Sequence, residues 1–400
     1  MAKMLLSAST PSQRALAADL AALLEERDPL PDAGEAGLDL RVRALRLSGR
    51  SGKWGRIARV SQQYAALVSA APDDAAPDPY EIGTLIAAAY PERVAKIWPE
   101  GAARFLLATG EMADLDAADP LSSSEWLSVA GLNASTSGPG RIFLAAPVSP
   151  DDLRPLARER DVVAWDSRKG SVIARREWRL GGLLLDEKPL QGNIRDRIVA
   201  EICRAAVKEG VSMFNFSDAV RSLQQRICAV ALWHPSLGLP DVGTEALLSR
   251  APEWLPLYIG KASTVAELRR LDVCQVIWGL LSYEQQQSVD RLAPAQITVP
   301  TGSRIALEYR TGAEAPVLRV RLQECFGLLD TPRVDDGRLP VLMDLLSPGY
   351  KSVQLTSDLR SFWNHTYFEV RKELRRRYPK HSWPDDPLTA LPVRGVRKQR

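Results

Sequence analysis

The chain has 400 residues, of which 45% are hydrophobic and 25% are charged, and its formal net charge is +3. This is ordinary globular composition, and the length is enough for roughly two to four domains. No stretch approaches the roughly 20 apolar residues of a membrane span, and the N-terminus lacks a signal-peptide pattern. We therefore expect a cytoplasmic protein with no membrane partner.

The small net charge hides a basic C-terminal end. Residues 347–400 contain 12 Lys and Arg against 5 Asp and Glu, whereas the residues before them contain 40 against 44. Such a concentration of positive charge fits contacts with phosphates, which are favoured by counterion release and do not depend on sequence. Charge runs are equally common on solvated helix faces, so a role in solubility alone stays open here.

Residues 1–101 are predicted to form a helical bundle. Apolar periodicity favours helices over Ala15–Glu26, Leu38–Leu47, Ile57–Ala71 and Ile82–Trp98, and a loop rich in Pro and Asp separates the last two. This part of the chain is the first domain that we expect.

Residues 102–190 change to a period of two, which is typical of strands. The expected strands are Arg104–Thr109, Trp126–Leu132, Arg141–Ala146, Val162–Trp165 and Val172–Leu185. They suggest an OB-like antiparallel β barrel, although a period of two does not distinguish this fold from other small barrels. OB-folds bind single strands through aromatic rings and positive charge. The candidate contacts, each of which could equally belong to the barrel core or rim, are Trp126, Arg141, Phe143, Arg175 and Arg176.

Residues 191–294 are predicted to form a second helical domain. Amphipathic helices are expected over Ile194–Glu209, Ser217–Trp233 and Val265–Leu281, the second of them capped by Ser217. His234 follows the second helix without another His, Cys or paired carboxylate nearby in sequence, which indicates a structural histidine.

Residues 295–400 are predicted to form a small β unit covered by a basic amphipathic helix. The expected strands are Ile297–Pro300, Arg304–Tyr309, Val317–Leu322, Val341–Leu346 and Ser352–Thr356. Arg319 and Arg321 alternate with apolar residues and should therefore face the same side of one strand, so both are candidate contacts for nucleic acid. The whole chain is thus predicted to be a multidomain α+β protein.

The covering helix is expected over Asp358–Tyr378, and Pro379 ends it. One apolar stripe should dock on the protein, and it consists of Trp363, Tyr367, Val370, Leu374 and Tyr378. After the helix, Trp-Pro and Asp-Pro dipeptides favour a stiff, extended tail. The helix and tail supply further candidate contacts for nucleic acid: Arg371, Lys372, Arg375, Arg376, Arg377, Lys380, His381 and Trp383.

No catalytic or metal-binding pattern is visible in the sequence. Cys203, Cys228, Cys274 and Cys325 lie far apart in apolar settings, which indicates buried free thiols and disfavours a zinc site. We find no nucleophile with an evident base and no zinc-protease motif. We therefore predict no catalytic residue, no cofactor site and no metal site.

Long motifs at the C-terminal end carry a family resemblance. They are Leu345-Leu346-Ser347-Pro348, Val353-Gln354-Leu355-Thr356-Ser357-Asp358-Leu359, Phe362-Trp363, Glu369-Val370-Arg371-Lys372-Glu373-Leu374, Arg377-Tyr378-Pro379-Lys380-His381 and Trp383-Pro384-Asp385-Asp386-Pro387. Shorter ones are Ala2-Lys3-Met4-Leu5-Leu6, Glu26-Arg27-Asp28-Pro29-Leu30, Trp254-Leu255 and Arg321-Leu322-Gln323-Glu324-Cys325-Phe326-Gly327. Together they resemble the C-terminal half of HrpB, a family of bacterial DEAH/RHA-type ATP-dependent helicases.

The resemblance implies an accessory region that follows two RecA-like motor domains, with a ratchet-like helical bundle and an OB-like barrel flanking the nucleic acid. ATP and magnesium would bind in those motor domains. The chain has no Asp-Glu-x-His box, and its nearest approach to a phosphate-binding loop, residues 49–54, has the wrong glycine spacing and ends in Trp54 where a hydroxyl is needed. The chain would then be an engineered fragment, a split gene product or a stand-alone relative, with no catalysis of its own.

Two functions from different classes remain at this point. In the first, the chain engages single-stranded RNA or DNA and works with RecA-like motor domains in cis or in trans. In the second, it is an interaction scaffold that docks a protein partner through Trp363, Tyr367, Leu374 and the Trp383-Pro384 pair. Salt dependence separates them, because phosphate contacts weaken steeply with salt and a desolvated aromatic interface does not.

Overall fold

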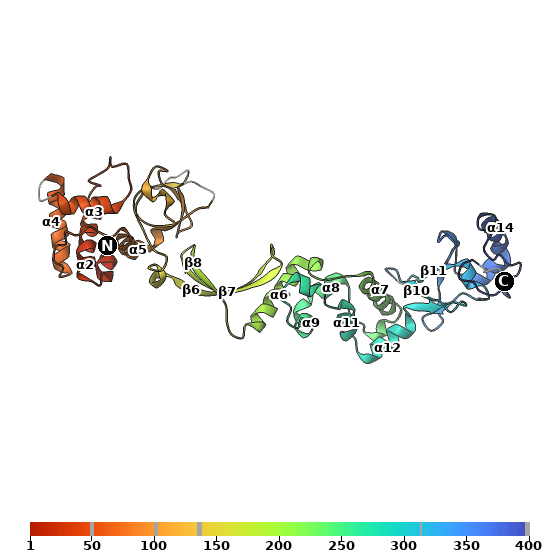
Figure 1. Ribbon diagram of the computed structural model, residues 1–400. Coiled ribbons are helices and arrows are strands. Elements are labelled where there is room, and N and C mark those ends of the chain that lie inside the picture. The colour runs from red at the N-terminus through yellow and green to blue at the C-terminus, as the bar shows by residue number, and fades with distance from the viewer. Residues whose placement is uncertain (49–51, 100–102, 134–137, 313, 397–400) are drawn as a thin grey trace. The chain divides into compact units, whose positions relative to one another are not determined.

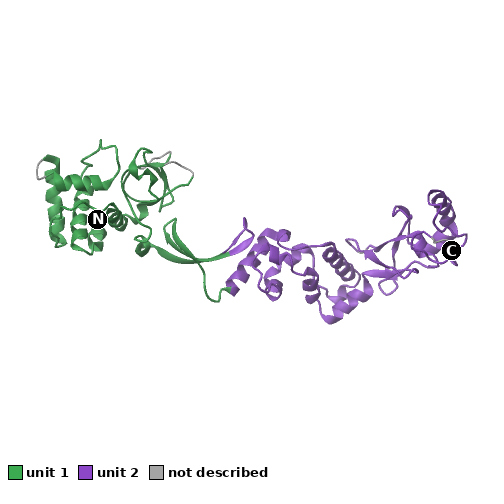
Figure 2. Cartoon of the chain, viewed as in Figure 1, with its two compact units in different colours: residues 1–163, 173–194 green, residues 164–172, 195–400 purple. Residues whose placement is uncertain are grey.

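A computed structural model describes residues 1–48, 52–99, 103–133, 138–312 and 314–396 and has the predicted mixed α and β character (Figure 1). The chain divides into two compact units (Figure 2). Unit 1 contains residues 1–163 and 173–194, and unit 2 contains residues 164–172 and 195–400. None of the described helices has the length and apolar character needed to cross a membrane.

Unit 1 begins with the expected helical bundle. Its helices are α1 (Ala2–Ser7), α2 (Pro11–Glu25), α3 (Leu38–Leu47), α4 (Gly52–Leu67) and α5 (Pro79–Ala89). Helix α2 starts with a capping box between Thr10 and Gln13. The prediction of one helix over Ile82–Trp98 is wrong beyond Ala89, because the residue before Pro91 is disfavoured in the helical region.

A closed five-stranded barrel follows and confirms the predicted barrel. Its strands are β1 (Val94–Ile97), β2 (Arg104–Leu107), β3 (Met112–Asp114), β4 (Trp126–Asn133) and β5 (Gly140–Pro147). They close in the order β1-β2-β3-β5-β4, and every pair is antiparallel except β3–β5. Leu127 and Val129 fill the barrel, whereas Ala130 and Leu144 join the core of the helical bundle. Strand β4 is therefore buried on both faces.

A separate three-stranded sheet comes next, formed by β6 (Arg158–Asp166), β7 (Ser171–Leu180) and β8 (Leu183–Pro189) in that order. The prediction that Val162–Trp165 and Val172–Leu185 belong to the barrel is wrong. The barrel closes instead with β1 and β3, which are too short for their alternation to be recognised.

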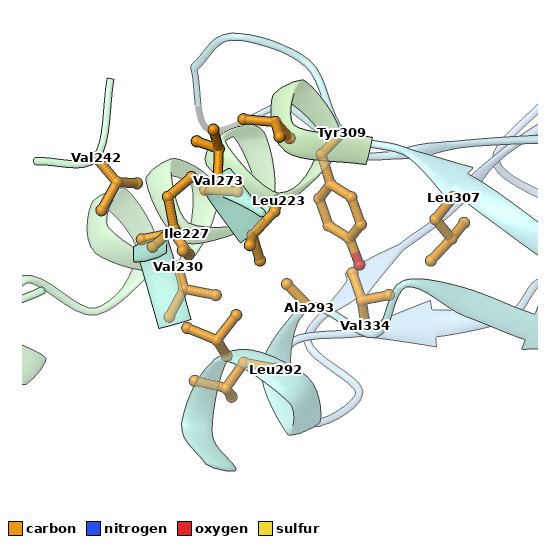
Figure 3. Packing of buried hydrophobic residues seen from close by; sticks show 14 of the residues in the cluster. Leu223, Ile227, Val230, Val242, Val273, Leu292, Ala293, Leu307, Tyr309 and Val334 are labelled. Atoms are coloured by element: carbon orange, nitrogen blue, oxygen red, sulfur yellow. The ribbon is translucent and has the colours of Figure 1, made fainter. Parts of the chain in front are cut away.

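Unit 2 opens with helices whose core continues into a sheet (Figure 3). The helices are α6 (Arg195–Glu209), α7 (Asp218–Trp233), α8 (Thr244–Ser249), α9 (Ala251–Tyr258), α10 (Val265–Leu268), α11 (Val273–Gly279) and α12 (Tyr283–Leu292). The predicted helix over Val265–Leu281 is in fact two helices, because Asp272 caps the start of α11. Leu223, Ile227 and Tyr309 are buried in the shared core.

The C-terminal part of unit 2 is a five-stranded sheet in the order β15-β14-β11-β10-β9. Its strands are β9 (Gln296–Thr298), β10 (Arg304–Glu308), β11 (Val317–Arg321), β14 (Leu342–Leu346) and β15 (Ser352–Thr356). A separate two-stranded sheet pairs β12 (Arg333–Val334) with β13 (Leu339–Pro340). Short 3₁₀-helices occur at η1 (Pro91–Arg93), η2 (Pro120–Ser123), η3 (Arg154–Leu156), η4 (Gly210–Met213), η5 (Pro235–Leu237) and η6 (Leu322–Cys325).

The chain then forms α13 (Leu359–Ser361), a π-helical turn η7 (Phe362–Thr366) and α14 (Tyr367–Arg377). The π turn inserts one extra residue per turn, so both Phe362 and Trp363 reach the core. The ring centroids of Phe326 and Trp363 are 6.2 Å apart, and Tyr367 meets Phe326 edge to face. These contacts fix the helix on the rest of unit 2.

Candidate nucleic-acid interface

The segment after α14 folds back onto unit 2, so the prediction of a stiff, extended tail is wrong. Trp383 is 8% exposed, and its Nε1 donates to the Tyr378 carbonyl at 2.9 Å. The Tyr367 hydroxyl donates to the Pro384 carbonyl, and the Gly327 amide donates to the Pro387 carbonyl. The carbonyls of this segment thus accept from donors of unit 2, whereas those of an exposed tail would accept from water.

Buried polar side chains hold the same tail from the sheet side. Gln323 donates through Nε2 to the Ser382 carbonyl at 2.8 Å, and its Oε1 lies 3.1 Å from His381 Nδ1. Burial acts to raise the pKa of Glu324, but hydrogen bonds from Ser303 and Arg321 outweigh it and lower that pKa. Glu324 is therefore a charged structural group, and Gln323 and Glu324 anchor this end of the chain.

The predicted cations of α14 differ in their availability. Arg371 is occupied, because its Nε donates to the Trp383 carbonyl at 3.0 Å and its guanidinium pairs with Asp385. Five other cations are exposed and form no ion pair with a described residue: Lys372, Arg375, Arg376, Arg377 and Lys380. We call these five residues the C-terminal cation ridge. Trp383 and His381 point into the fold instead of joining it.

The two predicted arginines of β11 are both paired. Arg319 Nε lies 3.1 Å from the Asp344 carboxylate on the neighbouring strand. Arg321 lies 2.8 Å from Glu324 and above the ring of Tyr350. Their charges are neutralised within unit 2, so they contribute little positive potential at its surface.

The barrel brings together two of its three main candidates. Arg141 and Phe143 alternate on the outer face of β5, where their exposures are 74% and 40%. The Phe143 ring covers Gly131, where a Cβ would lie 2.5 Å from it. Trp126 is 4% exposed and packs with Val148 and Leu180, so it belongs to the core. Arg141 and Phe143 thus lie together as a cation and a ring, and Arg141 also faces Asp116 at 4.0 Å.

These two residues line a cavity of about 810 Å³ between the barrel and the bundle. Its wall also carries acids, among them Glu26, Asp116 and Asp119. Such a wall would repel phosphates. The two candidate arginines of β7 also form ion pairs. Arg175 pairs with Glu177 and Glu187, and Arg176 pairs with Glu159 and Asp161.

Another group of cations was not predicted from the sequence. Lys3, Arg158, Arg160 and Arg179 line one cavity of unit 1 although they are far apart in sequence. The signal in the sequence was the alternation of Arg158 and Arg160, which places both on one face of β6. Because Glu159 and Asp161 alternate with these arginines, residues 158–161 have a net charge of zero and do not stand out as basic.

The remaining candidates are structural. His234 Nε2 lies 2.5 Å from Asp335 Oδ1, which satisfies the ring as expected. Cys203 and Cys325 are buried as expected, but Cys274 is only half-buried and Cys228 is exposed, so the expectation of burial is wrong for Cys228. In the part of the chain that the structure describes, no three His, Cys, Asp or Glu side chains gather into a metal-binding group. Of the loop at residues 49–54, residues 49–51 lie outside the described residues, and Lys53 donates to the Pro29 carbonyl.

Two family models match parts of this chain. Residues 254–387 match the family model of the ATP-dependent helicase C-terminal domain of HrpB. Residues 156–190 match the connector region of the ATP-dependent RNA helicase HrpB. The resemblance to HrpB seen in the sequence is confirmed over these two stretches.

Individual relatives agree with this resemblance. The ATP-dependent RNA helicase HrpB of Escherichia coli strain K12 is 36% identical over 403 residues, which is 100% of this chain and 48% of that protein. A crystal structure of the E. coli DExH-box NTPase HrpB aligns with 98% of this chain and 47% of its own, at 35% identity and a TM-score of 0.50. A crystal structure of the E. coli DEAH/RHA helicase HrpB aligns with 95% of this chain and 46% of its own, at 33% identity and a TM-score of 0.44. The chain thus spans about half the length of the relatives that it matches, and the matched half is the C-terminal one.

Proposed function

We propose that this chain is the nucleic-acid-engaging accessory region of an HrpB-like ATP-dependent RNA helicase. Its partners are single-stranded RNA or DNA and a pair of RecA-like motor domains, in cis or in trans. The motor domains bind ATP and magnesium and perform the hydrolysis, and the accessory region carries no turnover of its own. Similarity to the C-terminal half of an RNA helicase supports this proposal.

The C-terminal cation ridge is the observation that carries the proposal. Its five cations are exposed and have no ion-pair partner among the described residues, so binding a phosphate breaks no existing pair. The helix beneath is already fixed, because Trp363, Tyr367 and Leu374 are buried. Binding therefore does not have to order the segment, and little conformational entropy is lost.

The barrel is a second contact surface in this proposal. Closed five-stranded barrels of the OB type bind single strands by combining stacked rings with positive charge. Arg141 and Phe143 provide one of each on the outer face of β5. We assign Phe143 a stacking contact with a base, and we assign no phosphate to Arg141 because acids surround it.

The alternative function, a scaffold that docks a protein through the aromatic helix, is not favoured. It requires an accessible stripe, but Trp363 and Tyr367 are packed against Phe326. Trp383 is also buried. A partner could reach these rings only if the C-terminal part of unit 2 unfolded.

The ridge is tested by replacing three cations with neutral residues of similar length, Lys372→Gln, Arg375→Gln and Arg376→Gln. Fluorescence anisotropy with a labelled single-stranded oligonucleotide measures affinity across a salt series. Loss of three phosphate contacts should lower the slope of log K against log salt by about 2. Arg371 stays unchanged, because its replacement would release Asp385 and the tail.

The matched control carries Lys208→Gln, Lys261→Gln and Arg270→Gln, which remove the same charge from exposed sites elsewhere in unit 2. The control should bind like the wild-type chain. Equal slopes for the ridge variant, the control and the wild-type chain would exclude the ridge from the mechanism.

A further inference from the structure

The cavity lined by Lys3, Arg158, Arg160 and Arg179 has a volume of about 650 Å³ and lies within unit 1. It forms where α1, the turn between β2 and β3, the start of β6 and the turn between β7 and β8 come together. Most of its positive charge comes from residues 156–190, the segment that matches the HrpB connector region. We call it the connector cavity.

The charge in the connector cavity is largely uncompensated. Lys3, Arg158 and Arg160 are exposed and form no ion pair with a described residue. Arg179 shares the buried Glu177 with Arg175. Among the described residues that line the cavity Glu92 is the one acid, and it already faces Arg93 at 3.9 Å. The charge of the lining therefore favours a ligand with several negative charges.

The wall of the cavity is fixed before any ligand binds. The Gly182 amide donates to the Ala108 carbonyl at 2.8 Å, which joins the turn between β7 and β8 to the barrel. Gly181 has a φ of +55°, and a Cβ there would lie 2.2 Å from the Ala108 oxygen. Arg179 donates to the Gly182 carbonyl at 3.0 Å. The guanidinium is thus held at the cavity by the same turn.

The remaining lining indicates what kind of anion fits. Pro91, Pro155, Leu156 and Leu180 form an apolar part of the wall beside the cations. A free inorganic anion makes no use of apolar surface, whereas a nucleotide chain presents sugars and bases next to its phosphates. The cavity beside Arg141 is similar in size, but acids in its wall make it unsuitable for such a chain.

We propose that the connector cavity binds backbone phosphates of a single-stranded nucleic acid through Lys3, Arg158, Arg160 and Arg179. The inference rests on the proposed function and assigns it a phosphate-binding site in unit 1, in addition to the ridge in unit 2. Arg158 and Arg160 hold adjacent phosphates from one face of β6, and Arg179 approaches from β7. The contacts are to phosphate, so the site accepts any sequence.

The test replaces two freely exposed arginines, Arg158→Gln and Arg160→Gln, in the full 400-residue chain. Anisotropy with a labelled single-stranded oligonucleotide is measured between 50 and 300 mM salt. Two lost phosphate contacts should weaken binding roughly 25-fold at 0.1 M salt and lower the slope of log K against log salt by about 1.4. The matched control, Lys261→Gln with Arg270→Gln, should equal the wild-type chain in both quantities.

The outcomes of this experiment distinguish a failure of the connector cavity from a failure of the proposed function. If the wild-type chain and control bind with a steep slope and the Arg158 and Arg160 variant does the same, the connector cavity is excluded and the proposed function stands. If no protein binds the oligonucleotide at 50 mM salt, both fail. Unlabelled inorganic polyphosphate distinguishes the source of the phosphate: if the variant loses affinity for polyphosphate alone, the assignment to nucleic acid is overturned.

Discussion

The indole of Trp383 lies inside unit 2 and donates a hydrogen bond to the Tyr378 carbonyl. We therefore predict that Trp383→Phe lowers the free energy of unfolding by about 1–3 kcal/mol, because the smaller ring leaves a void in the core and the Tyr378 carbonyl keeps only the His381 amide as donor. The affinity of the folded protein for a single-stranded oligonucleotide should not change. Chemical denaturation and anisotropy measure the two effects.

Trp98→Phe is the matched control, since the ring of Trp98 is partly exposed and its loss should affect stability little. A Trp383→Phe protein with wild-type stability and weakened binding would show that the indole contacts nucleic acid, contrary to its place in the core.

Ion pairing determines which of the predicted cations remain available to bind a phosphate. The sequence does not show which cations are paired. Arg319 meets Asp344, which is 25 residues away, and Arg371 meets Asp385 across the folded tail. Local charge density correctly marked α14 as basic. It could not show that Arg371 is occupied whereas Arg375 is free, because that depends on where the tail returns.

At the scale of elements, the turn between β7 and β8 joins the connector sheet to the barrel. We predict that Gly181→Ala lowers the free energy of unfolding of unit 1 by roughly 3 kcal/mol, because a methyl group would collide with the Ala108 carbonyl and the backbone has a positive φ. Gly192→Ala is the control: its φ is also positive, at +101°, but nothing lies within 4 Å of the added Cβ.

The control should cost about 1 kcal/mol, from backbone strain alone. Thermal and chemical denaturation compare the two proteins. If they are equally stable, the turn is not packed against the barrel, and the wall of the connector cavity is not fixed in advance.

Elements with strong local signals could be predicted from the sequence. Leu38–Leu47 and Ser352–Thr356 were expected with the bounds that the structure has. The errors have a common physical origin in long-range packing: β1 and β3 are strands because the barrel pairs them, although four and three residues carry almost no periodic signal. Similarly, period two did not reveal that β4 is buried on both faces.

For the whole molecule, we propose two phosphate-binding surfaces, one in each compact unit. The C-terminal cation ridge and Arg158 with Arg160 share one property, exposed charge without a described partner. Neither surface contains a catalytic group. In the proposed function, a chain with these two surfaces holds a single strand.

The most direct test of this claim is the salt dependence of binding between the 400-residue chain and a single-stranded RNA. Four to eight phosphate contacts predict a slope of log K against log salt between about −3 and −6, so affinity should fall by roughly two orders of magnitude or more between 50 and 200 mM salt. Absence of binding at 50 mM salt, or an affinity that changes by less than about threefold over this range, would contradict the account.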